Sequence, residues 1–403
     1  MVPVHERSVL SMATIFLKPG KDKPVRQRHP WIFSGAIARV EGAPAAGEAV
    51  AVRASDGRWL AWAEYNPRSQ IRARAFCWDA QVEVDEAFWR ERLAASIARR
   101  DALMPGAEAR RLVFAESDGM PGLIVDQYGQ HLVVQFLTAG AEARKRMVVQ
   151  HLVQLLSPAS IIERDDPMRR KEGLPPSEGV WHGQPPAEPL TIIENGLKFL
   201  VDLRAGQKTG FYLDQAANRA ALAPHCAGKE VLNAFSYTGA FAVYALAAGA
   251  DHVINLDTSR DALALADANL RLNGFSPDRW QHIEADVFRQ LRVWRDEGRQ
   301  FDLIILDPPK FATSRGNLPR ATRGYKDINW LAMRLLRPGG LLATFSCSGL
   351  VSQDLFQKIL FGAALDAGRD ARIVGHFRQA PDHPVLLTFP EAAYLKGFLL
   401  QLA

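Results

Sequence analysis

The feature that most constrains this chain is the regular alternation of apolar runs and helical segments in its second half. The apolar runs lie at 230–235, 252–257, 301–307 and 340–346, and the helical segments at 238–249, 259–274 and 327–340. This β-α-β-α order predicts a mostly parallel, doubly wound sheet with helices on both faces. Because such sheets bind ligands at the carboxyl ends of their strands, we expect the chemistry just after each apolar run.

The first half of the chain has a different texture. Between 14 and 79, short apolar runs separated by Gly, Pro and Asp predict a small β-barrel or compact sheet. A helix is expected over 82–103, followed by strands with a second helix near 141–156. A Pro- and Gly-rich stretch at 165–189 indicates a loop or domain joint, and Asn195-Gly196 predicts a type I′ hairpin turn.

These changes in the pattern of apolar and turn residues divide the 403 residues into four parts. At roughly 100–200 residues per domain, this length is sufficient for two or three domains. We expect a dispensable N-terminal extension (1–11), a small β domain (12–80), a central α/β domain with its linker (81–190), and a C-terminal doubly wound α/β domain (191–403).

Charge and cysteine usage bear on the partner and the compartment. The chain has 49 Lys and Arg against 44 Asp and Glu, a mild excess that favours a polyanionic partner. Its three cysteines are too scattered for a zinc cluster or a disulfide framework, which predicts a cytoplasmic protein without a metal. No run reaches the roughly 18 apolar residues of a membrane helix, and 1–11 lack a signal-peptide core.

The first apolar run of the second half ends in a polar loop that leads into a helix. This loop contains a single glycine, so it is not the G-x-G-x-x-G fingerprint, which argues against a nicotinamide oxidoreductase. Backbone N–H groups at the start of the helix suit a nucleoside ligand without a pyrophosphate. The cofactor contacts that we expect here are Asn233, Phe235, Tyr237, Thr238 and Gly239.

Acidic residues follow the next two runs. Asp257 ends the second run 18 residues after Gly239, a spacing compatible with a carboxylate that binds both ribose hydroxyls. The alternative is that Asp257 caps the following helix, as Thr258 or Ser259 also could. Asp286, in the next short segment, is expected near an adenine amino group.

The last two apolar runs end in Asp307-Pro308-Pro309-Lys310-Phe311 and in Ser346-Cys347-Ser348. Two prolines hold a rigid turn at a strand end, and this turn presents Asp307 to the crevice, with Phe311 as a wall for a planar base. Cys347 falls at the same carboxyl edge as Asp307. A lone cysteine on a strand is usually an inert, small apolar residue, but this position favours a nucleophile.

Basic residues interleaved with an aromatic residue suit phosphate contacts and base stacking. The segment 18–31 has this character, and an ordinary solvated turn is its alternative reading. A second basic segment, 315–323, is expected to be a mobile loop beside the D-P-P turn. The RNA contacts that we expect are Lys18, Lys21, Lys23, Arg26, Arg28, Trp31, Lys310 and Phe311.

Taken together, these motifs resemble a known family. The order N-A-F-S-Y-T-G, Asp257, Asp286, D-P-P-K-F and F-S-C-S is similar to that of class I S-adenosylmethionine-dependent methyltransferases, and more narrowly of the bacterial ribosomal RNA large subunit methyltransferase I family. The likeness extends over nearly the whole chain from Met12 and includes 18–20, 28–33, 116–123, 208–215 and 323–329. It implies an N-terminal PUA barrel over 12–80, S-adenosylmethionine as cofactor, a Rossmann-like core, and Gln215 and Asp307 among the cofactor contacts.

The resemblance implies methylation of C5 of a cytosine in 23S ribosomal RNA. Cys347 would add to C6, and Asp307 would hydrogen-bond N3 or N4 while charge develops on the base. Many such enzymes carry a second cysteine after the D-P-P turn, which is absent here. The residues that could instead take the C5 proton are Lys310, Lys208 and Tyr212. A homodimer is left open.

Two rival functions remain on the same fold. D-P-P turns followed by an aromatic residue also serve methylation of exocyclic amines or purine N7, where the nitrogen attacks directly and no cysteine is required. The other rival is an RNA-binding ribosome-assembly factor with a vestigial methyltransferase domain, against which the intact Asp257, Asp307 and Cys347 argue.

Overall fold

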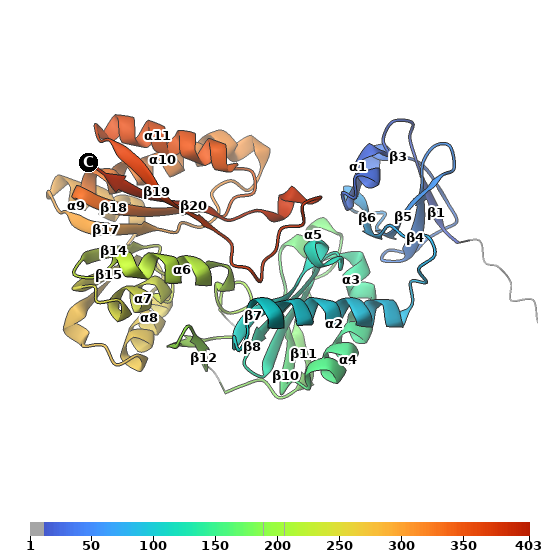
Figure 1. Ribbon diagram of the computed structural model, residues 1–403, viewed down its shortest axis with the longest axis horizontal. Coiled ribbons are helices and arrows are strands. Elements are labelled where there is room, and N and C mark those ends of the chain that lie inside the picture. Colours follow the sequence, from blue (N-terminus) through green and yellow to red (C-terminus); the bar gives the residue numbers. More distant parts are fainter. Residues whose placement is uncertain (1–11, 188, 205) are drawn as a thin grey trace, which may run out of the picture. The chain divides into compact units, whose positions relative to one another are not determined.

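The computed structural model describes residues 12–187, 189–204 and 206–403, and the chain separates into two compact units (Figure 1). The first unit comprises Met1–Ala187, Leu203–Gly210 and Pro384–Ala392, and the second comprises Glu188–Asp202, Phe211–His383 and Ala393–Ala403. The expected extension 1–11 lies outside the described residues. Over the described ranges, no helix is both long and apolar enough to cross a membrane.

The first unit begins with a six-stranded sheet in the order β2-β6-β5-β4-β1-β3. Its strands are β1 (Thr14–Leu17), β2 (Trp31–Phe33), β3 (Ile37–Glu41), β4 (Ala49–Arg53), β5 (Trp59–Tyr65) and β6 (Ile71–Cys77). Alternating apolar residues such as Ile15, Val50 and Ala63 form its core. The predicted short strands are confirmed. In the described part of the chain no ladder pairs the edge strands β2 and β3, so closure into a barrel stays a prediction.

A second sheet of the first unit has the order β11-β10-β9-β8-β7. Its strands are β7 (Ala109–Phe114), β8 (Leu123–Tyr128), β9 (His131–Phe136), β10 (Ser160–Glu163) and β11 (Gly179–Gly183), and its helices are α2 (Glu86–Leu103), α3 (Ala139–Ala143) and α4 (Lys145–Leu156). The stretch 165–189 is thus more than a loop. It contains α5 (Met168–Lys171) and the edge strand β11, because backbone pairing with β10 overrides its Pro- and Gly-rich composition.

The predicted hairpin joins β12 (Leu190–Glu194) to β13 (Leu197–Val201) in the second unit. Asn195 and Gly196 have φ of 50° and 80°, the positive values that a type I′ turn requires at both central positions. The turn prediction is therefore confirmed.

The second unit is built on a seven-stranded sheet in the order β16-β15-β14-β17-β18-β20-β19. The strands are β14 (Glu230–Ala234), β15 (His252–Asp257), β16 (Trp280–Glu284), β17 (Phe301–Leu306), β18 (Leu336–Ser346), β19 (Ala371–Arg378) and β20 (Lys396–Leu402). Strands β14 to β18 run parallel, whereas β20 is antiparallel to both of its neighbours. The doubly wound, mostly parallel sheet is thus confirmed.

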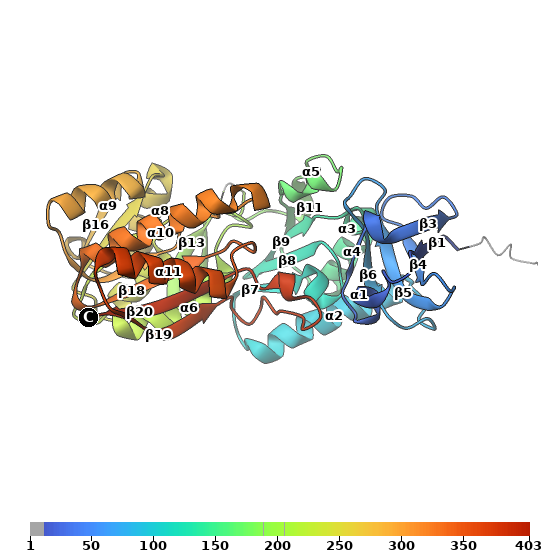
Figure 2. The ribbon, with the colours of Figure 1, turned by 90° about the horizontal axis from the view of Figure 1, so that it is seen from above.

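Helices cover both faces of this sheet. On one face lie α6 (Ala216–Leu222), α7 (Ala240–Ala247) and α8 (Arg260–Leu272), and on the other α9 (Val287–Asp296), α10 (Leu318–Leu335) and α11 (Gln353–Ala367) (Figure 1). Figure 2, seen from above, shows α10 and α11 lying over the strands. The central strand β17 is buried from Leu303 to Leu306, as a parallel strand covered on both faces must be.

Helix α10 differs from its prediction at both ends. It starts nine residues before the expected 327 and stops at Leu335, where β18 begins. The segment 315–323, expected to be a loop, is helical: Ser314 and Asn317 form a reciprocal capping box, and Pro319 stands in the first helical turn. These local signals explain the early start of the helix.

Candidate active site

The loop after β14 carries unusual backbone geometry. Phe235, Tyr237 and Gly239 have φ of 58°, 47° and 72°, and the first two are non-glycine residues in a left-handed conformation. Such conformations cost free energy and concentrate at ligand-binding sites. At Gly239, a Cβ atom would lie 2.8 Å from Cβ of Ala266 on α8, so this position also requires a glycine for packing.

The carboxylate of Asp257 ties this loop to the end of β15. One oxygen accepts a hydrogen bond from the Tyr237 N–H (2.9 Å) and the other from the Ser259 N–H (3.0 Å). The cap of α8 is Ser259, whose hydroxyl accepts from the Ala262 N–H (3.2 Å). Each oxygen of Asp257 keeps a further acceptor site, which a ribose hydroxyl can use.

Buried polar atoms without a protein partner cluster beside the same loop. Three buried side-chain atoms have no hydrogen-bond partner among the described residues: Ser236 Oγ, Thr238 Oγ1 and Asn255 Nδ2. Asn233 is buried in β14 and donates to Asn255 Oδ1 (2.8 Å) on β15. Buried polar groups normally find partners, so these atoms indicate a polar ligand that is provided from outside the chain.

Asp286 stands at the start of α9, where its side chain accepts a hydrogen bond from the Arg289 N–H (2.9 Å). The residue is exposed and follows β16, at the same carboxyl edge as Asp257. It is therefore a helix cap, and a contact with adenine stays a prediction.

Asp307 follows β17 and lies beside Gln215. The Gln215 amide is buried and donates to Asp307 Oδ2 (2.9 Å), while Asn218 Nδ2 donates to Gln215 Oε1. Two residues that were singled out separately in the sequence are thus in contact. This chain of amides fixes the orientation of the Asp307 carboxylate.

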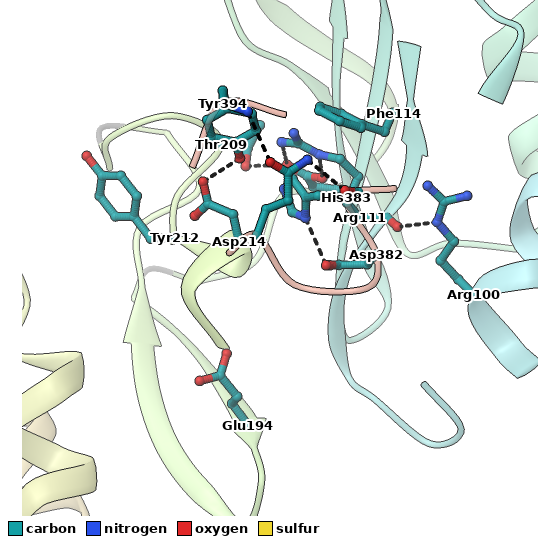
Figure 3. A network of polar contacts seen from close by, with 12 residues as sticks. Arg100, Arg111, Phe114, Glu194, Thr209, Tyr212, Asp214, Asp382, His383 and Tyr394 are labelled. Atoms are coloured by element: carbon teal, nitrogen blue, oxygen red, sulfur yellow. Dashed lines mark hydrogen bonds and ion pairs between the residues drawn. The ribbon is translucent and has the colours of Figure 1, made fainter. Parts of the chain in front are cut away.

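Tyr212 lies next to the loop after β14, against Tyr237. Its ring meets that of Tyr237 edge-on at 5.5 Å. Burial raises the pKa of Tyr212 far above its usual value, and the nearby Asp307 and Asp214 carboxylates raise it further. Asp214 in turn accepts a hydrogen bond from the Tyr394 hydroxyl (Figure 3). A phenol in this setting stays protonated, which argues against Tyr212 as a base.

Cys347 follows β18 in a loop that is bonded to the D-P-P turn. The Ser348 hydroxyl accepts from the Ala312 N–H (3.3 Å) and is hydrogen-bonded to the Tyr325 hydroxyl of α10 (3.2 Å). The thiol-bearing residue is partly exposed, whereas Cys77 and Cys226 are buried. Burial raises the pKa of Cys226 to about 12, so this thiol is an unsuitable nucleophile.

Phe311 and Lys310, on the turn itself, differ in their surroundings. The ring of Phe311 packs against Tyr325 (4.7 Å) and Phe288 (5.8 Å) beside the apolar core. Lys310 is exposed. Phe311 therefore has a packing role in the structure, and its contact with a base stays a prediction.

Sequence reasoning missed Lys396, the first residue of β20. It pairs in register with Ser346, and its buried ammonium donates to Ser348 O (2.6 Å) and Val351 O (2.7 Å). Burial lowers the pKa of Lys396 to about 8, an effect that Cys347 opposes and Lys310 reinforces. The only signal in the sequence is a lysine directly before the apolar run 397–400.

The basic segment belongs to the first unit. Its five basic side chains are all exposed, although Arg26 pairs with Asp22 and Lys18 donates to Gly35 O (3.0 Å). Trp31 is half-buried, donates to Glu116 (2.8 Å) and packs against Phe389 at 4.8 Å. Lys208, a candidate base, also belongs to the first unit. Among the residues described, no group of three or more His, Cys, Asp or Glu is arranged to hold a metal ion.

Two family models match the chain. The model of the S-adenosylmethionine-dependent methyltransferases matches residues 128–399, and that of the PUA-like domains matches residues 15–78. S-adenosylmethionine is accordingly the cofactor of this protein, and its N-terminal sheet is a PUA-like domain.

Solved structures share this fold. A Streptococcus mutans protein assigned as an S-adenosylmethionine-dependent methyltransferase is 21% identical, with a TM-score of 0.84 over 96% of this chain and 99% of that one. A second structure, assigned as a methyltransferase and complexed with SAH, gives a TM-score of 0.85 over the same shares, also at 21% identity. At this identity the likeness concerns the fold alone.

Curated relatives are much more similar in sequence. The ribosomal RNA large subunit methyltransferase I of Aeromonas salmonicida is 51% identical over 390 residues, which cover 96% of this chain and 98% of the relative. The proteins of the same name from Shewanella amazonensis and Vibrio vulnificus are each 50% identical, with the same shares covered. The chain belongs to the ribosomal RNA large subunit methyltransferase I family, within the S-adenosylmethionine-dependent methyltransferases.

Proposed function

We propose that this protein methylates C5 of a cytosine in 23S ribosomal RNA, and that Cys347 is its nucleophile. The observation that supports this most is the bond between two loops: Ser348, next to Cys347, is hydrogen-bonded to Ala312 of the D-P-P loop. Asp307 follows β17 and the partly exposed Cys347 follows β18. Because these two neighbouring strands are parallel, both residues lie at the same carboxyl edge of the sheet. The names of the curated relatives support a ribosomal RNA substrate.

The chain's own residues suit the cofactor. Asp257 would hold the ribose hydroxyls, and the buried Ser236 and Thr238 hydroxyls, which lack partners among the described residues, would contact the ligand from the loop after β14. When bound, S-adenosylmethionine supplies an electrophilic methyl group and leaves as the thioether.

The cysteine is required because C5 of cytosine has no lone pair with which to attack a methyl group. The Cys347 thiolate forms a bond to C6, and the electron pair of the C5–C6 double bond then becomes available at C5. After methyl transfer a base takes the C5 proton, the electrons of the C5–H bond restore the double bond, and the C6–S bond breaks to return the thiolate. Asp307, oriented by Gln215, would hold N3 or N4 of the base throughout.

We assign RNA binding to the exposed basic segment 18–28 of the PUA-like domain.

We also propose that the domains of the chain span residues 12–80, 81–190 and 191–403. The protein would act in the cytoplasm, together with its ribosomal substrate. The raised pKa of Tyr212 makes this residue unsuitable as the acceptor of the C5 proton. Of the three candidate acceptors, Lys310 and Lys208 remain.

Trapping with 5-fluorocytosine tests the covalent step. Ribosomal RNA that contains this base should form an adduct stable on denaturing gels, because fluorine at C5 cannot leave as a proton. Wild type with S-adenosylmethionine should give the adduct, and Cys347→Ala should lose both adduct and methylation while it still binds cofactor. Cys77→Ala and Cys226→Ala are the matched controls. Comparable methylation by Cys347→Ala would replace the C5 chemistry with attack by an exocyclic amine or N7.

A further inference from the structure

Lys396 is a buried cation in a part of the site that the proposed chemistry does not yet use. Its side chain leaves the antiparallel strand β20 opposite Ser346, and its two hydrogen bonds reach the carbonyls of Ser348 and Val351. These three positions bracket Cys347 on both sides. Lys396 is only 7% exposed, so little water screens the charge of its ammonium group, and its field on neighbouring groups is strong.

The ionisable groups around the Cys347 thiol come from several elements. Lys396 approaches from β20, Tyr325 from α10, and Tyr212 from the segment before α6, and each interacts electrostatically with the thiol. Lys310 and Asp307, on the D-P-P loop, act on Lys396 and on Tyr212 respectively. Both tyrosines have pKa values raised by burial and remain neutral, so Lys396 is the buried positive charge in this set.

We propose that Lys396 is a positioning residue for Cys347: its ammonium group fixes the loop 348–351 and stabilises the thiolate. This inference rests on the proposed function, since only a nucleophilic Cys347 requires a thiolate. The proton released by the thiol passes to solvent, and Lys396 keeps its own proton at neutral pH because its pKa, about 8, lies above 7. A nearby lysine lowers the pKa of a cysteine thiol, and the thiolate is the form that reacts.

The pH dependence of thiol alkylation tests this assignment without RNA or cofactor. The full chain is treated with iodoacetamide across a pH series, and mass spectrometry follows the peptide that contains Cys347. Wild type should reach half-maximal rate below the ordinary cysteine pKa of about 8.5. In Lys396→Gln, which keeps N–H donors without charge, the midpoint should rise by about one unit, and alkylation at pH 7 should slow about tenfold.

Matched variants separate charge from structure. Lys396→Arg keeps the charge and should keep the wild-type midpoint, and Lys358→Gln, which removes an exposed lysine of α11, should not change it. At high pH the rates of wild type and Lys396→Gln should converge, because both thiols are then ionised. A purely structural role of Lys396 would instead alter the rate at every pH.

Identical midpoints in wild type and folded Lys396→Gln would overturn the proposal. If Lys396→Gln does not fold, the wild-type midpoint decides: a value at or above that of an ordinary cysteine contradicts the assignment, and a lower value that Lys396→Arg preserves supports it. Methylation by Cys347→Ala would defeat the proposed function and leave the alkylation result standing, so the two failures are distinguishable.

Discussion

The carboxylate of Asp257 accepts a hydrogen bond from the backbone N–H of Tyr237 over 2.9 Å, which joins the ends of two parallel strands. The bond holds Tyr237 in its left-handed conformation, with φ of 47°. The acidic residue therefore has two tasks, since it shapes the loop and offers further acceptor sites to a ligand. A ligand-binding loop without the usual glycines requires such a support.

We expect Asp257→Ala to weaken S-adenosylmethionine binding by about 1.5–3 kcal/mol, the range for hydrogen bonds to a charged group. Isothermal titration calorimetry measures this change. Asp261→Ala, which removes an exposed carboxylate from the first turn of α8, is the control and should bind normally. An unchanged affinity in folded Asp257→Ala would remove the ribose assignment.

Gly239→Ala should destabilise the second unit more than Gly274→Ala does. Both glycines have positive φ, of 72° and 76°, so alanine is strained at either position by about 1–2 kcal/mol. Only at Gly239 would the new Cβ meet another atom closely, because Cβ of Ala266 is 2.8 Å away, whereas Gly274 has nothing within 4 Å. Urea denaturation should show the difference, and equal losses would mean that α8 moves aside without cost.

Neutralising Lys18, Lys21 and Arg26 together should weaken RNA binding and flatten its dependence on salt. Each phosphate contact contributes a slope of about −0.7 to −0.9 on logarithmic axes through counterion release. Affinities for ribosomal RNA at several salt concentrations give this slope. A triple variant of the exposed Arg260, Arg271 and Lys358 removes the same charge from the second unit and serves as control. Equal slopes in the two variants would identify the segment as an ordinary surface turn.

Tyr212→Phe should retain turnover within about tenfold, because the neutral phenol of Tyr212 is not the base that takes the C5 proton. Loss of a true general base would lower turnover by about 10²–10⁴-fold. The raised pKa of Tyr212 also affects stability at alkaline pH. Below about pH 10 the phenol is neutral in both states, but at higher pH only the unfolded state ionises, so stability falls as the pH rises. Denaturation between pH 9 and 11 should show a smaller loss for Tyr212→Phe. A thousandfold drop in turnover would restore Tyr212 as a base.

Local signals in the sequence predicted much of this fold, and long-range pairing accounts for what they missed. Asn195-Gly196 fixes its turn through two adjacent residues, and the parallel strands could be recognised because each is an unbroken apolar run. Lys396 could not be assigned, because its importance depends on pairing with Ser346, 50 residues earlier in the chain. The edge strand β11 was missed for the same reason, since its composition is that of a loop.

The site residues also divide into those that local signals predict and those that depend on long-range contacts. Asp307 and Cys347 could be placed at one edge because parallel strands share their direction, whereas the contact of Gln215 with Asp307 spans 92 residues and depends on tertiary packing. The segments Leu203–Gly210 and Pro384–Ala392, which pack with the first unit, lie in the sequence among residues of the second. No local pattern distinguishes them.

The position of β20 has a consequence for synthesis of the protein. This strand lies between β18 and β19, so on the ribosome the growing chain presents an unpaired edge of β18 until residues 396–402 emerge. A chain that stops before Lys396 would keep that edge open to pairing with other chains, which favours aggregation. We therefore expect the sheet to be completed and Lys396 to reach its partners Ser348 and Val351 in the same step of folding, after β18 and β19 have been made.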